Sequence, residues 1–300
     1  MKNKSLGQTT DFDLRLLRIF KTVADCRSFS AAEIMLGITR SAISLHMSDL
    51  EKRLGMRLCQ RGRAGFSLTD EGREILKLSE TMMASIEGFR QQVNEMHKNL
   101  RGEFNIGIIN NLVTQPKMHI TNALEKLNRH GPGIRINLSM STESEIERGL
   151  MDGRLHVGVL PKASPISGLD YTQLYDEKSY LYCSEKHPLF DYDGEPDANT
   201  FSQYDAIIPT YRMTADILDI LQYFNGTASA SDREGIAFLI LTGRYVGFLP
   251  DHYAALWQEK GIMKPIAPQQ LCVQTEISVV TRKGRRPNSI LELFLNSLPL

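Results

Sequence analysis

The sequence predicts an α/β protein with an N-terminal winged helix-turn-helix, a long linker helix and a two-lobed α/β body. Three observations support this prediction. Near the N-terminus, short helical patterns meet at glycine-containing turns, which is typical of a helix-turn-helix. Residues 69–97 then place apolar side chains every three or four positions. From Gly102 onward, strand and helix patterns alternate, as they do in parallel sheets flanked by helices.

The composition is that of an ordinary globular chain. It has 300 residues, 42% of them hydrophobic and 23% charged, a length that favours roughly two domains. The four cysteines lie far apart, without the spacing of a disulfide framework or a zinc site. The apolar run 236–241 is far shorter than the roughly 20 residues of a membrane helix, and the N-terminus lacks a secretory apolar core. We therefore expect a cytoplasmic protein with no membrane partner.

The zero net charge conceals an uneven distribution. Residues 1–66 carry 12 Lys and Arg against 6 Asp and Glu, whereas residues 99–300 carry 19 against 23. A basic N-terminal segment on a mildly acidic body is expected when one end of a protein binds a polyanion. Basic segments of this size also occur on ordinary solvated surfaces.

The second predicted helix has signals at both of its ends. Ser30 and Glu33 fit a capping box, and Phe29 and Ile34 are spaced as a hydrophobic staple. Gly37 stands where a C-terminal glycine ends a helix of two turns.

Two further helices complete the predicted helix-turn-helix. An amphipathic helix over 11–25 precedes it, and a third helix begins at the N-cap Thr39 and ends at Gly55. The side chains that the third helix is expected to bury are Ala42, Ile43, Met47, Leu50 and Leu54.

A glycine-containing hairpin with a basic tip is predicted next. Strands at 56–59 and 66–68 flank a turn that carries Arg61 and Arg63, in the position of a wing. Thr69 then caps a helix that extends to about residue 97.

The long helix carries an apolar stripe with nearly the spacing of a coiled-coil seam. Its positions are Ile75, Leu78, Met82, Ile86, Phe89, Val93 and Met96. The stripe packs either on the protein's own body or on a partner helix in a dimer. We favour the dimer, because a linker helix in a monomer seldom has so apolar a face.

The remaining 200 residues predict an α/β body. Strands are expected at 104–108, 134–140, 155–160, 169–175, 178–183, 206–209, 227–229, 245–249 and 275–281. Helices are expected at 115–128, 143–150, 215–224, 232–241, 252–260 and 289–298. Interruptions near 161–168 and 265–270 divide this body into two lobes, with the last strand and helix returning to the first lobe.

At this point the chain resembles a known family, the LysR-type transcriptional regulators. The N-terminal resemblance rests on Asp13-Leu14-Arg15-Leu16-Leu17-Arg18-Ile19-Phe20, Ser28-Phe29-Ser30-Ala31-Ala32-Glu33, Ser41-Ala42-Ile43-Ser44, Leu50-Glu51-Lys52-Arg53-Leu54-Gly55, Arg57-Leu58 and Leu68-Thr69-Asp70-Glu71-Gly72. A more diffuse C-terminal resemblance rests on the pattern from Gly149 through Gly153 to Val159, and on Arg244-Tyr245-Val246-Gly247-Phe248-Leu249-Pro250. Together these segments cover nearly the whole chain.

The resemblance implies the protein's organisation and partners. It implies a linker-helix dimer that assembles further into a tetramer, and a two-lobed effector domain that resembles periplasmic binding proteins. It also implies double-stranded DNA, a small-molecule effector and RNA polymerase as partners, and no cofactor. The expected parts are a DNA-binding domain (1–68), a linker helix (69–98) and an effector domain (99–300), the latter with lobe I at 102–161 and 271–300 and lobe II at 162–270.

The third helix is the expected recognition helix, whose first turns reach base edges in the major groove. At positions 45 and 49, where the family often has a basic or polar residue and an arginine, this chain has Leu45 and Asp49. Family base contacts at these positions therefore do not transfer, although Leu45 suits a thymine methyl group. The DNA-binding candidates are Ser30, Thr39, Arg40, Ser41, Ser44, Leu45, Ser48, Arg61 and Arg63.

Arg40 is the strongest of these candidates, because a bidentate contact between arginine and guanine discriminates well between bases. Ser30 and Thr39 have the alternative role of helix caps, with a phosphate contact as an addition. Arg61 and Arg63 are expected to meet phosphates, and each alone is equally compatible with a solvated surface.

Effector-binding candidates follow strands or precede helices, where ligands bind in two-lobed α/β proteins. They are Asn110, Asn111, Thr114, Ser141, Thr142, Arg212, Ser229 and Ser231. Helix N-termini with hydroxyl groups and one arginine favour a small anion. Ser231 with Glu234, and Thr142 with Glu145, also fit capping boxes, so these hydroxyl groups have a purely structural alternative.

An enzyme is the less favoured class. The chain has no G-x-G-x-x-G, P-loop, H-E-x-x-H or G-x-S-x-G motif, and its histidines lack metal-ligand spacing, so no catalytic or metal-binding residue is assigned. Cys183 and Cys272 are conceivable redox sensors, against the commoner role of inert small side chains. The alternative function is a small-molecule-binding or catalytic α/β body whose basic segment serves another partner. Sequence-specific binding to paired DNA half-sites distinguishes a regulator from this alternative.

Overall fold

The computed structural model describes the chain except for residues 1–9, 63–64, 97–99, 193 and 195–196. It divides into two compact units, residues 1–89 and residues 90–300, which are described separately below. Among the described helices, none combines the length and the apolar character that a membrane crossing requires.

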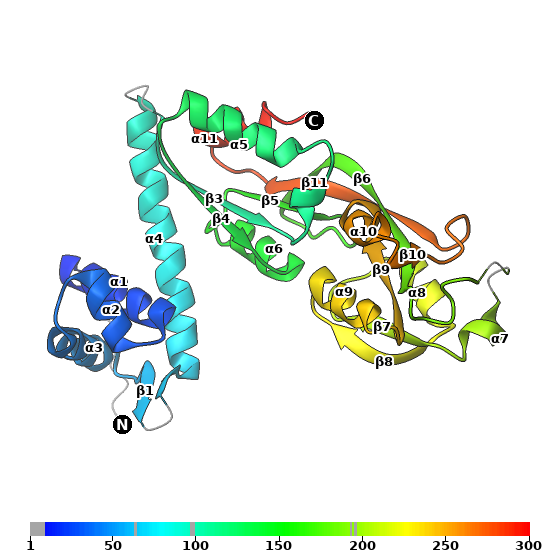
Figure 1. The fold of residues 1–300 in the computed structure, drawn as a ribbon. Coiled ribbons are helices and arrows are strands. Elements are labelled where there is room, and N and C mark those ends of the chain that lie inside the picture. Colours follow the sequence, from blue (N-terminus) through cyan, green and yellow to red (C-terminus); the bar gives the residue numbers. More distant parts are fainter. Residues whose placement is uncertain (1–9, 63–64, 97–99, 193, 195–196) are drawn as a thin grey trace. The chain divides into compact units, whose positions relative to one another are not determined.

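The first unit is built on three helices (Figure 1): α1 (Asp11–Cys26), α2 (Phe29–Leu36) and α3 (Arg40–Leu54). As predicted, α2 ends at Gly37 and α3 at Gly55, both with positive φ, a conformation that glycine adopts without steric cost. The side chains buried between the helices include Leu16, Phe20, Val23, Ile43, Met47 and Leu50.

The predicted N-cap of α2 is wrong by two residues. Ser28, not Ser30, is the N-cap, and its hydroxyl group accepts a hydrogen bond from the Ala31 amide. The staple is also absent, because Ile34 is 84% exposed while Phe29 is buried. Ser28 satisfies an amide of the first turn, which leaves Ser30 inside the helix.

A two-stranded hairpin follows the helices. Strands β1 (Cys59–Gly62) and β2 (Gly65–Leu68) pair antiparallel, with Cys59 opposite Leu68 and Arg61 opposite Phe66. The first strand begins later than the predicted 56–59, because the Leu58 and Cys59 amides are engaged by the Glu51 carboxylate at the end of α3.

The long helix α4 covers Asp70–Met96, as predicted. The Thr69 hydroxyl group caps it by accepting a hydrogen bond from the Gly72 amide at 2.9 Å. Gly72 lies against the Leu58 carbonyl so closely that a Cβ there would be 1.9 Å from the oxygen. Part of the apolar stripe stays exposed in the single chain, with Leu78 57% and Phe89 67% accessible.

The second unit contains a nine-stranded sheet with the order β4-β3-β5-β11-β6-β9-β7-β8, and β10 pairs with β6. Its strands are β3 (Arg101–Ile108), β4 (Gly133–Met140), β5 (Val157–Pro161), β6 (Leu169–Ser184), β7 (Asp205–Pro209), β8 (Asn225–Ala230), β9 (Tyr245–Pro250), β10 (Met263–Pro265) and β11 (Cys272–Arg282). Its helices are η1 (Leu112–Thr114), α5 (His119–His130), α6 (Glu143–Met151), α7 (Ala198–Phe201), α8 (Ala215–Leu221), α9 (Arg233–Leu241), α10 (Asp251–Gln258) and α11 (Ser289–Leu295).

The expectation of wholly parallel sheets is wrong at the centre of this unit. The strands β4, β3 and β5 are parallel, as are β9, β7 and β8. Between these two groups run β6 and β11, which pair antiparallel with each other. β11 also pairs antiparallel with β5, and β6 pairs antiparallel with β9. The two strands predicted at 169–175 and 178–183 are one 16-residue strand, β6, because residues 176 and 177 pair with β11 and continue the ladder.

Separate hydrophobic cores define two lobes. Lobe I contains Phe104, Ile106, Leu127, Val159 and Phe294 in its core, contributed by β3, β5, α5 and α11. Lobe II has two clusters, one around Leu181, Phe201 and Val246 and the other around Ile207, Ile236 and Leu249. The long strands β6 and β11 supply side chains to both lobes and join them (Figure 1). Such a joint leaves room for a site between the lobes.

Candidate functional site

The outer face of α3 is polar and accessible. Arg40, Ser41 and Leu45 are exposed, and Ser44 and Ser48 are half-buried. Ile43 and Met47 on the opposite face are fully buried. The helix therefore presents its first two turns to solvent, with an arginine at its first position, where a major groove could receive it.

The remaining candidates of the first unit differ in their surroundings. The Thr39 hydroxyl group accepts from the Ala42 amide at 3.3 Å and lies 3.0 Å from the Ser41 hydroxyl group, so it caps α3. Ser30 is exposed in the first turn of α2. The side chain of Arg61 and all of Arg63 lie outside the described part of the chain.

A buried carboxylate fixes α3 against α1. Asp13, at the start of α1, accepts hydrogen bonds from Arg53 at the end of α3, one of them 2.8 Å from Nη2 to Oδ2. The amide and hydroxyl groups of Thr10 donate to the same carboxylate, each at 2.8 Å. The Arg53 hydrogen bond is the largest cause that lowers the pKa of Asp13. This contact ties the end of α3 to the start of α1.

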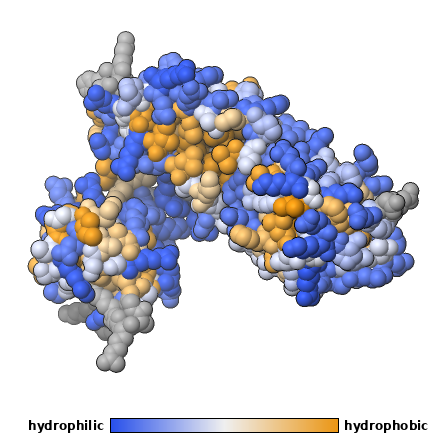
Figure 2. Space-filling model, in the orientation of Figure 1, coloured by the Kyte–Doolittle hydropathy of each residue, from blue (hydrophilic) through white to orange (hydrophobic). Residues whose placement is uncertain are grey.

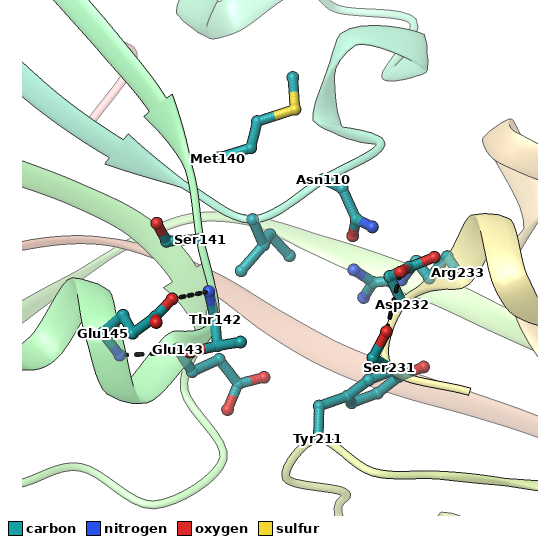
Figure 3. Close-up of a pocket in the computed structure, with 11 residues that line it drawn as sticks. Asn110, Met140, Ser141, Thr142, Glu143, Glu145, Tyr211, Ser231, Asp232 and Arg233 are labelled. Atoms are coloured by element: carbon teal, nitrogen blue, oxygen red, sulfur yellow. Dashed lines mark hydrogen bonds between the residues drawn. The ribbon is translucent and has the colours of Figure 1, made fainter. Parts of the chain in front are cut away.

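A hollow of about 320 Å³ lies between the two lobes of the second unit (Figure 3). Lobe I contributes the end of β4 and the start of α6, and lobe II contributes the loop after β7 and the start of α9. The lining residues are Ile109, Asn110, Met140, Ser141, Thr142, Glu143, Glu145, Tyr211, Ser231, Asp232 and Arg233. A volume of this size accommodates a small molecule.

A second hollow, of about 470 Å³, adjoins the first. The two share Thr142, Glu143, Tyr211 and Ser231, and the second adds Ser144, Thr210 and Arg212 to the lining. We refer to the two hollows together as the cleft.

The cleft gathers five of the eight residues predicted for effector binding. These are Asn110, Ser141, Thr142, Arg212 and Ser231. Asn111, Thr114 and Ser229 do not line either hollow. Ser229 is exposed on β8, an edge strand of the sheet, and Thr114 is engaged elsewhere, as described below.

Arg212 does not offer the cleft a free positive charge. Its Nη1 and Nη2 donate to Oε1 and Oε2 of Glu147 on α6, each at 3.2 Å. The Glu147 side chain is only 5% exposed and also accepts from the Tyr171 hydroxyl group at 3.0 Å. Arg212 from lobe II is therefore held by lobe I, which removes the main argument for an anion in this part of the cleft.

A second set of polar contacts joins the lobes beside the cleft. The Glu177 carboxylate on β6 accepts from Arg233 Nη2 on α9 and lies 3.0 Å from His252 Nε2 on α10. His252 Nδ1 is in turn 2.7 Å from the hydroxyl group of Thr114, which belongs to lobe I. Through Arg233 and His252, Glu177 on β6 is thus connected to lobe II, and through His252 and Thr114 to lobe I.

Glu143, the first residue of α6, has a different environment. Only 8% of the residue is exposed, and its Oε2 is buried without a hydrogen-bond partner. Burial raises the pKa of its carboxyl group to about 7, while Arg212 and Arg233 oppose that shift and Glu147 adds to it. Figure 3 shows the carboxyl group directed into the cleft, toward Tyr211.

The two helix starts at the cleft are capped by their own side chains. Thr142 and Glu145 form the predicted capping box at α6. The box predicted for Ser231 and Glu234 is wrong, because Asp232 is the N-cap of α9 and accepts from the Gly235 amide at 2.8 Å. The Ser231 hydroxyl group instead donates to Asp232 at 3.0 Å.

Sequence reasoning missed three lining residues of the cleft, Glu143, Tyr211 and Arg233. Tyr211 adjoins the predicted Arg212, and Arg233 lies two residues after the predicted Ser231, so their positions next to the end of a strand and the start of a helix were available as signals. Glu143 has the usual appearance of an acidic residue in the first turn of a helix. Residues of lobe II lie across the cleft from it, and no local sequence pattern predicts that neighbourhood.

Neither the cysteines nor the possible metal ligands among the described residues form a second functional site. Cys183 and Cys272 are free thiols, and burial raises the pKa of the Cys183 thiol to about 12, which disfavours the reactive thiolate. Within the described residues, no three His, Cys, Asp or Glu side chains are grouped to hold a metal ion.

Comparisons of the sequence with known proteins agree with this two-part arrangement. The family model described as LysR substrate binding domain matches residues 97–299, and the model described as bacterial regulatory helix-turn-helix protein, lysR family, matches residues 14–73. The HTH-type transcriptional activator BauR of Pseudomonas aeruginosa is 58% identical over 298 residues, which cover 99% of this chain and 98% of BauR. MetR of Escherichia coli is 28% identical over 177 residues, covering 59% of this chain and 54% of MetR.

Solved structures share the fold at low identity. The LysR family transcriptional regulator CbnR has a TM-score of 0.67 at 18% identity, with 95% of this chain and 97% of CbnR covered. A structure of full-length CbnR in complex with its target DNA gives the same TM-score, with 95% of this chain and 98% of CbnR covered. A full-length OxyR variant from Pseudomonas aeruginosa has a TM-score of 0.61 at 17% identity, covering 98% of this chain and 96% of OxyR.

Proposed function

The chain belongs to the LysR family of transcriptional regulators, and from this premise we propose which of its residues read DNA and which receive the effector. It is a DNA-binding regulator with an effector-binding domain. In line with the activator that it resembles over its whole length, we propose that it activates transcription in the bacterial cytoplasm by recruiting RNA polymerase, without an enzymatic activity of its own.

In this proposal the first two turns of α3 read base edges. Arg40 contacts a guanine, Leu45 contacts a thymine methyl group, and Ser41, Ser44 and Ser48 contribute polar contacts. Contacts to phosphates position the helix but carry no sequence information. We assign these contacts to Ser30, Thr39, Arg61 and Arg63. The supporting observation is the exposure of Arg40, Ser41 and Leu45 on one face of a helix whose other face is buried.

Two exposed apolar surfaces support self-association. The first is the stripe of α4, where Leu78 and Phe89 are exposed. The second is β4, the edge strand of lobe I, where Leu138 is 42% and Met140 59% exposed. Figure 2 shows apolar surface on this part of lobe I, beside α5. We propose that α4 forms a dimer and that the effector domains join dimers into a tetramer.

The effector binds between the two lobes, in the cleft that the start of α6 and the start of α9 line. Asn110, Ser141, Thr142 and Ser231 are the proposed polar contacts. Because the lobes are joined through β6 and β11, an effector that prefers one arrangement of the lobes shifts the population toward it. This shift would change how the paired recognition helices are spaced and how DNA is held.

The test is selection of bound fragments from genomic DNA by the purified protein at two salt concentrations. A dyad-symmetric motif that persists at the higher salt is the expected result, because base contacts supply a salt-independent part of the affinity. Binding without sequence preference that disappears at the higher salt would contradict the assignment of α3 as a reader of bases. Repeating the selection with Arg40→Ala then identifies the base pair that this residue reads.

A further inference from the structure

The charges that line the cleft are nearly all committed to partners within the protein. Arg212 is paired with Glu147, and Arg233 with Glu177. Among the lining acids, Asp232 caps α9 through the Gly235 amide, and Glu145 accepts from the Thr142 amide. Each of these four side chains therefore has a charged or polar partner within the protein.

Glu143 is the exception. Its carboxyl group lines both hollows, it is more than nine-tenths buried, and its Oε2 has no hydrogen-bond partner. A buried polar atom without a partner costs free energy, and a bound group that supplies a hydrogen bond removes that cost. The two guanidinium groups nearby act on Glu143 only through space, without an ion pair to it.

The neighbour of Glu143 across the cleft is aromatic. Tyr211 lines both hollows, and its ring already has the Arg233 guanidinium carbon 5.9 Å from its centre. An aromatic face beside a carboxylate is an arrangement that favours a cationic nitrogen.

We infer that the effector of this protein carries a positively charged nitrogen, which binds in the cleft against the carboxylate of Glu143 and the ring of Tyr211. The inference rests on the proposed function, in that it takes the cleft as the effector site. It reverses the expectation of an anionic effector, because the arginine that motivated that expectation is already neutralised by Glu147.

The protonation of Glu143 gives this site a pH dependence. Its carboxyl group has a pKa of about 7, set by burial and Glu147 against Arg212 and Arg233, so the empty site is largely protonated at about pH 6 and largely ionised at about pH 8. A permanently charged ligand that requires the carboxylate therefore binds about tenfold more tightly at about pH 8 than at about pH 6. The ligand expels the proton from Glu143 when it binds below pH 7.

The experiment measures the melting temperature of the full-length protein with two matched series of probes. One series comprises short linear primary amines of several chain lengths whose far end is a methyl, hydroxyl, amide or carboxylate group. The other comprises the same compounds without the amine. The inference predicts that at least one amine stabilises the wild-type protein more than its amine-free match does, and that Glu143→Gln weakens its binding about ten- to a hundredfold.

Glu145→Gln is the matched control, because Glu145 lines the same hollow but is exposed and engaged with Thr142. It is expected to leave amine binding nearly unchanged. Amine binding that is as strong in Glu143→Gln as in wild type, or a panel in which no amine stabilises wild type beyond Glu143→Gln, overturns the inference. Stabilisation by the amine-free series alone would overturn it while leaving the cleft as the effector site. Failure of the cleft itself is recognised differently, as an amine whose binding survives substitution of Thr142 and Ser231.

Discussion

Glu147 of lobe I and Arg212 of lobe II form a two-point ion pair beside the cleft, with both N–O distances 3.2 Å. The carboxylate is almost fully buried, whereas the guanidinium is 35% exposed. Sixty-five positions along the chain separate the two residues, so their pairing exists only when the lobes are brought together. The pair therefore links the two lobes beside the cleft.

Glu147→Gln is expected to destabilise the second unit by about 1–3 kcal/mol, because it removes one charge of a mostly buried pair and leaves Arg212 partly desolvated. Urea unfolding monitored in the full-length protein measures the loss. Glu125→Gln is the control, since its pair with Arg129 on α5 is exposed and worth about 0.5 kcal/mol at most. Equal losses in the two variants would show that the pair between the lobes contributes no more than a surface contact.

The raised pKa of Glu143 predicts that the ligand-free protein loses folding stability as the pH rises. Because the folded pKa of about 7 exceeds the ordinary 4.5, the protonated carboxyl group favours the folded state, and this advantage is lost as the pH rises from about 4.5 to about 7. Relative to wild type, Glu143→Gln should gain stability over that interval, reaching about 3 kcal/mol and then remaining constant. Denaturation at several pH values measures the difference. A difference that does not change with pH would mean that Glu143 ionises normally.

In the first unit, the pKa of the Asp13 carboxyl group is shifted in the opposite direction, so its ionised form stabilises the fold. Arg53 lowers the pKa of Asp13, so the stability that Asp13 contributes is present above its ordinary pKa of 3.8 and is lost as the pH falls below that value. Asp13→Asn should destabilise residues 11–54 by about 1–3 kcal/mol at neutral pH. Hydrogen exchange of α1 and α3 reports this loss locally.

Asp25→Asn provides the comparison for Asp13, because the ion pair of Asp25 with Lys21 on α1 is largely exposed. It should change exchange in α1 only slightly. If the two variants exchange alike, the contact between α1 and α3 does not depend on Asp13.

The predictable parts of the fold were those encoded locally. The helix ends at Gly37 and Gly55, and the caps Thr39 and Thr69, follow from residues within one turn of each boundary. The predicted stripe on α4 likewise needs only helical periodicity.

The unpredicted parts depend on contacts between distant residues. The strand β6 continues through Asp176 and Glu177 because β11, about a hundred residues later, pairs with it. Glu143 and Glu147 share helix α6 and look alike in sequence, yet Glu147 pairs with Arg212, whereas Oε2 of Glu143 is buried without a hydrogen-bond partner. Their separate environments depend on residues of lobe II, so sequence patterns identified hydroxyl groups and Arg212 of the cleft but not Glu143.

The exposed stripe of α4 predicts the effect of a charge on self-association. Phe89 is 67% exposed in the single chain, and a glutamate in its place would be buried without a partner in a helix-to-helix contact. Phe89→Glu should therefore reduce the sedimentation coefficient to that of a smaller species. Arg73→Glu, at an exposed position on the opposite side of the same helix, should leave it unchanged. An unaltered mass for Phe89→Glu would rule out this stripe as the dimer contact.

Arg40 is the first residue of α3, the proposed recognition helix, and is exposed there, so its guanidinium group is accessible to a base edge. Arg40→Ala should relax the preference for one base pair in each half-site by about ten- to a hundredfold, corresponding to about 1–3 kcal/mol of discrimination. Competition between the selected site and its single-base variants measures this effect. Lys52→Ala, at the far end of α3 with a 74% exposed side chain, should leave base preference unchanged. A uniform loss of affinity across all sequences in Arg40→Ala would instead make Arg40 a phosphate contact, because phosphates are the same at every base pair.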